Sequence, residues 1–288
     1  MSRPMFDRAL PPLLKAALSP ESEAWMAGLE VAGYEPVWAV GEQQPQATVR
    51  AYAVGKLALF DGERPTRVSI PIVAYVLRAG DLTMSVDAGL SARWRAEIAD
   101  AAPDDGPGPG QRYLPVLDGP TFAEQLEAEK IDVDRAVCTH LHIDHVGGAG
   151  ELGVPIEASA EELAEALSGE SGGYPAEELA GVRFSPIRMD RGPVGPWLQH
   201  SILAPGLLAL ATPGHTRGSV SVFACLGGTW ALVCGDAPYP ASHQPDSDAY
   251  RGMLRIRRAL GEMGGTLVLA GHDTAALRAC ADGAWLGN

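Results

Sequence analysis

The hydrophobic and polar positions in the first third of the chain follow two periods, one helical and one extended. Apolar residues recur at helical spacing over residues 10–18, and a second helical stretch covers residues 23–29. Alternation of apolar and polar positions predicts strands over residues 48–60 and 68–77, joined by a turn at Asp61-Gly62. We therefore expect an antiparallel pair of strands behind a helical N-terminal segment.

The rest of the chain predicts short strands in runs with helices between and after them. Strands are predicted over 82–86, 133–138, 202–211, 219–226, 230–234 and 266–270, and helices over 121–130, 158–167, 248–263 and 274–281. Thr121 and Glu124 have the spacing of a capping box at the start of the first of these helices. Residues 103–120 are rich in Pro, Gly and Asp and predict a loop. This order favours a mixed-sheet α+β architecture over a regular βαβ series.

Composition and charge exclude several classes of protein. An apolar fraction of 46% in 288 residues is enough for one large core, so extended disorder is not expected. The net charge of −14 argues against a nucleic-acid partner and against an anionic membrane surface, because both need a basic footprint. We find no signal-peptide pattern or membrane-spanning run, and the four cysteines form no CxxC pair. These features predict a cytoplasmic protein with reduced core cysteines.

One short segment concentrates the residue types that bind metal ions. After the strand predicted over 133–138, the chain reads Thr-His-Leu-His-Ile-Asp-His-Val-Gly-Gly over residues 139–148. In an extended segment, residues two apart face the same side, so His140 and His142 can point at one ion. Asp144 and His145 lie where the strand should turn toward a helix and can face a second ion. The two glycines that follow permit the tight turn that this path needs.

Three later strand ends carry a further histidine or aspartate, each beside a glycine. They are His215 in Thr-Pro-Gly-His-Thr, Asp236 in Cys-Gly-Asp and His272 in Ala-Gly-His-Asp. Imidazole and carboxylate ligands without thiolates suit zinc or another borderline divalent metal. A carboxylate such as that of Asp236 can also bridge two cations. The sequence therefore predicts a metal site assembled from several strand ends.

The order of these motifs resembles the metallo-β-lactamase superfamily, over roughly residues 68–281. The resemblance implies an αββα sandwich, in which two mixed sheets pack face to face with helices outside and the metals at one edge. It also implies two divalent metal ions, which we expect to be zinc. The first ion would be held by His140, His142 and His215. The second would be held by Asp144, His145 and His272, with Asp236 bridging both. Asp87 matches an aspartate of the family that supports the metal-bearing loops.

Within that superfamily, the chain is most similar to the quorum-quenching N-acyl-homoserine lactonases. Tyr239 stands three residues after Asp236, where those lactonases have a tyrosine that binds the lactone carbonyl or stabilises the oxyanion. The resemblance implies a hydrolase in which a bridging hydroxide opens a lactone or a related carboxylic ester. It gives Asp144, Asp236 and Tyr239 catalytic roles.

Two alternative activities and one non-enzymatic role remain open at this point. The stretch Thr-Arg-Gly-Ser after His215 is equally typical of thioesterases, and hydrolases of organophosphorus esters share the same metal site. A non-enzymatic scaffold is disfavoured because every ligand position is filled. The expected partner is a small neutral or acyl-bearing substrate, with no nucleic acid and no membrane, and a homodimer is open.

The remaining features are interpreted as structural. We divide the chain into an N-terminal helical extension (residues 1–47) and a catalytic domain (residues 48–288). The acidic group Glu157, Glu161, Glu162 and Glu165 and the basic group Arg251, Arg255, Arg257 and Arg258 are interpreted as solvated helix faces. Trp25 and Trp38 are expected to pack in the core rather than to cover a substrate.

Overall fold

The computed structural model describes residues 11–34, 46–61, 64–95, 113–168, 173–226, 229–263 and 266–287. Most of the loop predicted over residues 103–120 lies outside the described residues, as does Trp38. The strands are β1 (Ala47–Asp61), β2 (Arg64–Ala79), β3 (Leu82–Val86), β4 (Tyr113–Val116), β5 (Arg135–Val137), β6 (Ile156–Ser159), β7 (Phe184–Ile187), β8 (His200–Ala204), β9 (Leu207–Ala211), β10 (Val220–Leu226), β11 (Thr229–Gly235) and β12 (Leu267–Ala270). The helices are α1 (Pro12–Lys15), α2 (Pro20–Ala27), α5 (Phe122–Glu129), α6 (Ile143–Val146), α7 (Ala160–Ser168), α8 (Ala176–Leu179), α9 (Asp248–Glu262) and α10 (Thr274–Ala279), with short 3₁₀ turns at Ala92–Arg95, Ala149–Glu151 and Ala281–Gly283.

The described strands form two mixed sheets. One has seven strands in the order β4-β1-β2-β3-β5-β6-β7, and the other has five in the order β12-β11-β10-β9-β8. Strands β1, β2, β3 and β4 pair antiparallel, whereas β3, β5, β6 and β7 pair parallel. In the second sheet only the pair β11–β12 is parallel among the described strands. Both the α+β class and the antiparallel pairing predicted for the first two strands are confirmed.

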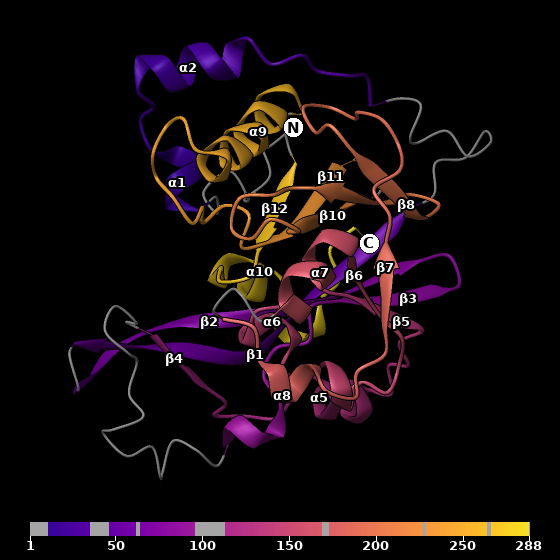
Figure 1. The fold of residues 1–288 in the computed structure, drawn as a ribbon. Coiled ribbons are helices and arrows are strands. Elements are labelled where there is room, and N and C mark those ends of the chain that lie inside the picture. Colours follow the sequence, from indigo (N-terminus) through magenta and orange to yellow (C-terminus); the bar gives the residue numbers. More distant parts are fainter. Residues whose placement is uncertain are drawn as a thin grey trace.

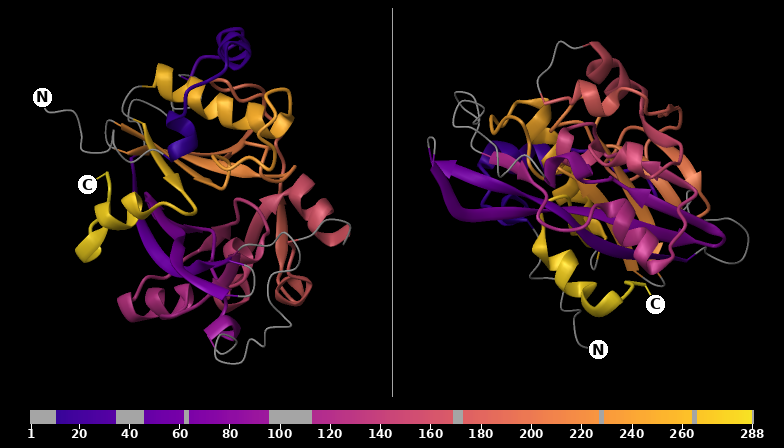
Figure 2. Two further views of the ribbon diagram at one scale, coloured as in Figure 1. Left: turned by 90° about the vertical axis from the view of Figure 1, so that its left-hand side faces the viewer. Right: turned by 90° about the horizontal axis from the view of Figure 1, so that it is seen from below.

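The two sheets pack face to face with helices on their outer faces (Figures 1 and 2). Helix α9, with α1 and α2 beside it, covers the five-stranded sheet, and α5 covers the seven-stranded sheet. Strand β10 is buried on both sides: Val222 and Ala224 belong to the core between the sheets, and Phe223 and Cys225 belong to the core under α9. Each fully buried Val or Phe stabilises such a layer by about 1.5–3 kcal/mol. The structure is thus an αββα sandwich.

Several local predictions hold and others need correction. The capping box is present, because Glu124 N–H donates to Thr121 Oγ1 (3.2 Å) and Thr121 N–H donates to the Glu124 carboxylate (2.8 Å). The single strand predicted over 202–211 is wrong: β8 and β9 form a hairpin. The pair Pro205-Gly206 makes its turn, because Gly206 adopts a positive φ of 78°. The helix predicted over 158–167 begins later, because residues 156–159 form the short parallel strand β6.

Helix α2 contacts α9 through Trp25. Trp25 packs against the core under α9, as expected for a packing role, and the guanidinium groups of Arg251 and Arg255 lie 5.5 Å from its ring centroid. Both arginines are half-buried, so the prediction of a fully solvated basic face is wrong for them. The long stems of arginine pack well on an aromatic ring, which is why a basic stretch can belong to a helix interface.

Two further expectations concern the cysteines and the membrane. Cys138, Cys225, Cys234 and Cys280 are all buried and free, which confirms the prediction of reduced core cysteines. None of the helices in the described part of the chain combines the length and the apolar character needed to cross a membrane.

Candidate metal centre

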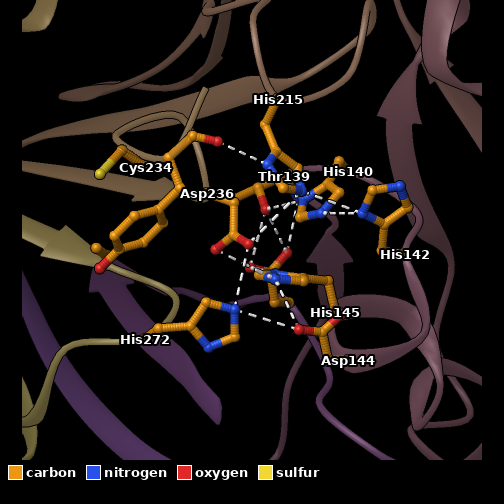
Figure 3. Close-up of polar contacts among 12 residues, drawn as sticks. Thr139, His140, His142, Asp144, His145, His215, Cys234, Asp236 and His272 are labelled. Carbon is orange, nitrogen blue, oxygen red and sulfur yellow. Dashed lines mark hydrogen bonds and ion pairs between the residues drawn. The ribbon is translucent and has the colours of Figure 1, made fainter. Parts of the chain in front are cut away.

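The predicted site residues follow strand ends that meet at one edge of the sandwich. The segment after β5 carries His140 and His142 and leads directly into α6, which carries Asp144 and His145. From the facing sheet, His215 follows β9, and Asp236 and His272 follow β11 and β12. Figure 3 shows these imidazoles and carboxylates pointing toward one another. All seven residues that the sequence singled out as ligands are therefore brought together, while their binding of metal ions stays a prediction.

Three of them form a group made of imidazoles alone, here called the histidine group (His140, His142 and His215). His140 Nε2 lies 3.1 Å from His142 Nδ1, and His142 Nδ1 lies 3.1 Å from His215 Nε2. His140 is buried, and the other two are partly exposed. Three ring nitrogens that converge on one point are the donor arrangement of a histidine-bound metal ion.

The other four form a group that includes carboxylates, here called the mixed group (Asp144, His145, Asp236 and His272). His272 Nε2 lies 3.3 Å from Asp144 Oδ2 and 3.2 Å from Asp236 Oδ2. His145 Nε2 lies 3.6 Å from Asp144 Oδ2 and 3.5 Å from Asp236 Oδ1. Within each group, the candidate donor atoms all lie within 4.8 Å of one another.

Asp236 links the two groups. Its Oδ2 atom is 3.6 Å from His215 Nε2 in the histidine group and 3.2 Å from His272 Nε2 in the mixed group. The side chain is 7% exposed, so water screens these contacts little. A buried carboxylate in this position can neutralise positive charge in both groups at once.

The far nitrogens of three imidazoles are fixed by acceptors outside the two groups. His145 Nδ1 is 2.8 Å from Asp87 Oδ2, His215 Nδ1 is 2.8 Å from the Tyr239 carbonyl, and His272 Nδ1 is 2.8 Å from the Pro71 carbonyl. In the neutral form of each ring, a proton on Nδ1 donates to one of these oxygens and leaves the Nε2 lone pair directed into the centre. Such contacts orient the rings of metal-binding histidines and select their tautomers.

Asp87 also fixes the segment that carries the histidine pair. Its Oδ1 accepts from the Thr139 N–H (2.7 Å), and the Thr139 hydroxyl donates to both carboxylate oxygens (3.0 and 2.9 Å). Asp87 itself adopts a positive φ of 63°, a strained conformation for a residue other than glycine. One buried carboxylate thus supports Thr139, next to His140, and His145 on α6.

The two groups differ in their electrostatics. Burial lowers the pKa of His140, and burial together with the neighbouring His215 lowers the pKa of His142 to about 4. Burial also opposes protonation of His272, but Asp236 and Asp144 outweigh it and raise its pKa to about 10. Burial opposes ionisation of Asp144, yet His145 and His272 lower its pKa to about 2. At neutral pH, His140 and His142 are therefore neutral and ready to bind a cation, whereas His272 in the mixed group is protonated.

The donor set fits divalent metal ions. His145 Nε2 and Asp236 Oδ1 are buried atoms without a hydrogen-bond partner, which is costly unless a ligand satisfies them. In the histidine group, ring nitrogens 3.1 Å apart face one another inside a buried cluster. Neutral imidazoles and carboxylates together are the ligands that zinc and similar borderline cations prefer.

Glycine is required beside two of the candidate ligands. A Cβ atom at Gly271 would lie 2.7 Å from Asp236 Oδ1 and 2.7 Å from His145 Cε1. At Gly235, where φ is 47°, a Cβ atom would lie 2.2 Å from Thr139 Oγ1. The glycines before Asp236 and His272 therefore allow the two halves of the centre to approach each other.

Tyr239 lies beside the mixed group. Its N–H donates to the Asp236 carbonyl (2.7 Å), and its ring centroid is 6.0 Å from that of His272. Burial, together with the charge of Asp236, raises the pKa of the phenol, so the hydroxyl stays protonated at neutral pH and can act as a donor. The oxyanion role of Tyr239 stays a prediction.

One buried carboxylate beside the site, that of Glu162, was not predicted from the sequence. It was assigned to a solvated helix face, and this is wrong, because Glu162 is fully buried. Its Oε1 accepts from the Leu141 N–H (2.8 Å), and its Oε2 accepts from the Thr216 hydroxyl (2.6 Å). Helical period places Glu162 on the same face of α7 as the buried Ala166, but it does not predict that a carboxylate can be buried there, because the partners of Glu162 lie far away in the sequence.

The comparisons with known proteins agree with this geometry. The family model described as the Metallo-beta-lactamase superfamily matches residues 70–284. The chain is 33% identical over 128 residues to the Probable metallo-hydrolase Rv2300c of Mycobacterium tuberculosis (strain ATCC 25618 / H37Rv), and the match covers 40% of each chain. The chain thus spans less than half the length of this curated relative.

Solved structures of lactone hydrolases have a similar fold. One is an N-acyl homoserine lactone hydrolase with the product N-hexanoyl-L-homoserine bound at its catalytic metal center. Its TM-score is 0.65 at 19% sequence identity, and the match covers 84% of this chain and 99% of that one. Another is a B. thuringiensis AiiA mutant with N-decanoyl-L-homoserine bound, with the same score, identity and coverage. At this identity the likeness establishes the fold.

Proposed function

Because the chain belongs to the metallo-beta-lactamase superfamily, we propose that it is a dinuclear metal-dependent hydrolase that opens a lactone or cleaves a related carboxylic ester. The observation that carries this proposal is the juxtaposition of two donor groups with Asp236 between them, at 3.6 Å from His215 and 3.2 Å from His272. We propose that the histidine group holds one cation, that the mixed group holds the other, and that both are zinc.

The chemistry supplied at such a centre is Lewis acidity, under which a water becomes nucleophilic near neutral pH and the carbonyl under attack is polarised. The chain's own contribution is orientation. Asp87 and the carbonyls of Pro71 and Tyr239 fix three imidazoles, so that their lone pairs meet without rearrangement during the reaction. The ionised Asp144 and Asp236 offset the positive charge of the bound cations.

Tyr239 supports the choice of an acyl substrate. A protonated phenol beside the mixed group can donate a hydrogen bond to the oxygen on which negative charge develops during attack on a carbonyl. The structural neighbours that bind N-hexanoyl- and N-decanoyl-L-homoserine share this fold, which makes acyl-homoserine lactones the first substrates to examine.

A substrate panel tests the proposal. Zinc-loaded protein is incubated with short- and long-chain acyl-homoserine lactones, simple γ- and δ-lactones, an acyl thioester and a phosphotriester. We expect the highest kcat/KM on a lactone. A preference for the thioester or the phosphotriester would replace lactone hydrolysis with one of those activities, and no turnover of any substrate would contradict a hydrolase. Zinc analysis of the same sample shows whether a negative result comes from metal-free protein.

A further inference from the structure

The buried carboxylate of Glu162 contacts both loops that carry the histidine group. Its Oε1 accepts from the Leu141 N–H at 2.8 Å, and Leu141 lies between His140 and His142. Its Oε2 accepts from the Thr216 hydroxyl at 2.6 Å, and Thr216 directly follows His215. One side chain on α7 therefore connects two segments that lie more than 70 residues apart in the sequence but supply all three imidazoles.

The packing around Glu162 leaves it little freedom. Its own N–H donates to Ser159 Oγ (3.0 Å), and Ser159 Oγ donates to the Gly218 carbonyl (2.6 Å). A Cβ atom at Gly218 would lie 2.1 Å from the Glu162 nitrogen, so only glycine lets the turn after His215 approach the start of α7 this closely. The Thr216 hydroxyl is also 2.7 Å from Ser219 Oγ, within the same turn.

Because these groups are buried, the loss of any one of these hydrogen bonds is costly. Glu162 and Leu141 are fully buried, and Thr216 is 9% exposed. A buried charge is tolerated only where hydrogen bonds compensate for its lost hydration, and here two donors on the two ligand loops provide them. If either loop shifted, both the carboxylate and a buried donor would lose a partner. The position of each loop is thus tied to the other through Glu162.

We propose that Glu162 is a positioning residue that sets the spacing of His140, His142 and His215, and that it acts on metal retention and turnover without contacting the substrate. The proposal rests on the metal-binding role given to the histidine group above. It predicts that the strength of metal binding by this group depends on a side chain outside the donor set. Partners of this kind change metal affinity or activity by about 10–100-fold.

Zinc affinity provides the test. Zn²⁺ binding to the metal-free full-length protein is measured by competition with a chromophoric chelator, with kcat and KM on the best lactone measured in parallel. In Glu162→Ala both buried donors lose their acceptor, so we expect one of the zinc-binding steps to weaken by about 10–100-fold and kcat to fall more than KM rises. Glu162→Gln should lose less, because the amide can still accept from Leu141 N–H and donate to Thr216 Oγ1.

Two controls separate positioning from plain stability. Glu161→Ala alters the exposed neighbour on the same helix and should leave zinc affinity and kcat unchanged. Leu126→Ala, in the core between α5 and the seven-stranded sheet, should lower the melting temperature and leave zinc affinity unchanged.

Thr216→Val removes one of the two hydrogen bonds to the Glu162 carboxylate and should weaken zinc binding. The double variant Glu162→Ala/Thr216→Val should bind zinc no more weakly than Glu162→Ala alone, because Thr216 acts through the carboxylate that is already absent.

The results of these measurements either support or contradict the positioning role of Glu162. A folded Glu162→Ala protein with the zinc affinity and kcat of the wild type would overturn the proposal. If Glu162→Ala is insoluble, wild-type zinc affinity and kcat in both Glu162→Gln and Thr216→Val would overturn the proposal. Wild-type protein that binds zinc but hydrolyses no lactone would contradict the proposed function, while the affinity comparison would still test Glu162. Wild-type protein that binds no zinc would contradict both proposals.

Discussion

The histidine group and the mixed group share one edge of the sandwich but differ in charge. The histidine group contains imidazoles alone, and burial keeps His140 and His142 neutral, with the pKa of His142 at about 4. The mixed group contains two carboxylates, which raise the pKa of His272 to about 10. His140 and His142 can bind a cation without releasing a proton, whereas His272 in the mixed group must release one. The two halves of the centre are thus prepared for metal binding in different ways.

The supports of the two groups differ as well. In the mixed group, a single contact at 2.8 Å orients each imidazole, from Asp87 for His145 and from the Pro71 carbonyl for His272. In the histidine group, the Tyr239 carbonyl orients His215 in the same way, at 2.8 Å. There the backbone of the ligand loops is held as well, by Asp87 at Thr139 and by Glu162 at Leu141. The histidine group thus adds support of its loops to the orientation of a ring.

Replacement of Asp236 should have the largest effect, because this carboxylate faces both groups. In Asp236→Ala we expect loss of one or both metal ions and at least about a 100-fold fall in kcat, beyond the range for residues outside the donor set. Metal content by elemental analysis and turnover on the best lactone are measured on the same sample. Asp246→Ala, which removes an exposed carboxylate, is the control. Full turnover in Asp236→Ala would show that Asp236 does not join the groups.

The pH dependence of zinc binding should separate the groups. Since His272 has a pKa of about 10 in the metal-free protein, it is protonated at neutral pH, and zinc must displace that proton from the mixed group. Burial opposes protonation of His145 as well, but Asp87 and Asp144 outweigh it and raise its pKa, so zinc affinity there should rise by at least about tenfold per pH unit between about pH 6 and pH 8. Because burial keeps His140 and His142 neutral over that range, these two ligands release no proton when zinc binds, and affinity at the histidine group should vary less with pH.

Chelator competition at several pH values measures the two steps. His142→Ala removes a donor from the histidine group and should leave the pH-dependent step. Two steps with the same pH dependence would mean that the groups do not differ as described.

Gly271→Ala perturbs two members of the mixed group. The added methyl group would lie 2.7 Å from both Asp236 Oδ1 and His145 Cε1, so these side chains must move apart. We expect the zinc affinity of the mixed group to fall by about tenfold, at the lower end of the range for residues that position metal ligands. Gly261→Ala on α9, where a Cβ atom would meet nothing within 4 Å, is the matched control. Equal zinc affinity in the two variants would argue against close packing of the centre at Gly271.

The smallest effect is expected for Tyr239→Phe. Removing only the hydroxyl should lower kcat on lactones a few-fold, well below the roughly 100-fold lost where an oxyanion donor is indispensable. Metal content should not change, because the contact with His215 comes from the backbone carbonyl of Tyr239. An unchanged kcat would make Tyr239 a packing residue of the core under α9.

The sequence predicted the candidate ligands well because their signal is local. His140, His142, Asp144 and His145 lie within six residues, and the remaining three follow apolar strands and stand beside glycines. The apolar strands themselves predicted most of both sheets. The hairpin of β8 and β9 was predicted as a single strand because its residues form one apolar run, although Pro205-Gly206 marks its turn.

Glu162 could not be predicted from local pattern. Alternation and helical period describe which face of an element is apolar, and Glu162 interrupts that pattern as a buried charge. Its burial is stabilised by Leu141 and Thr216, which reach it only after the two sheets have packed together. The same holds for Arg251 and Arg255, whose partner Trp25 comes from the other end of the chain.

The central claim is that two cations bind side by side with Asp236 between them. Anomalous X-ray scattering at the zinc edge, from crystals of zinc-loaded protein, tests it most directly. We predict two peaks, one among His140, His142 and His215 and one among Asp144, His145 and His272, with the Asp236 carboxylate contacting both. A single peak, or zinc bound away from these residues, would contradict it.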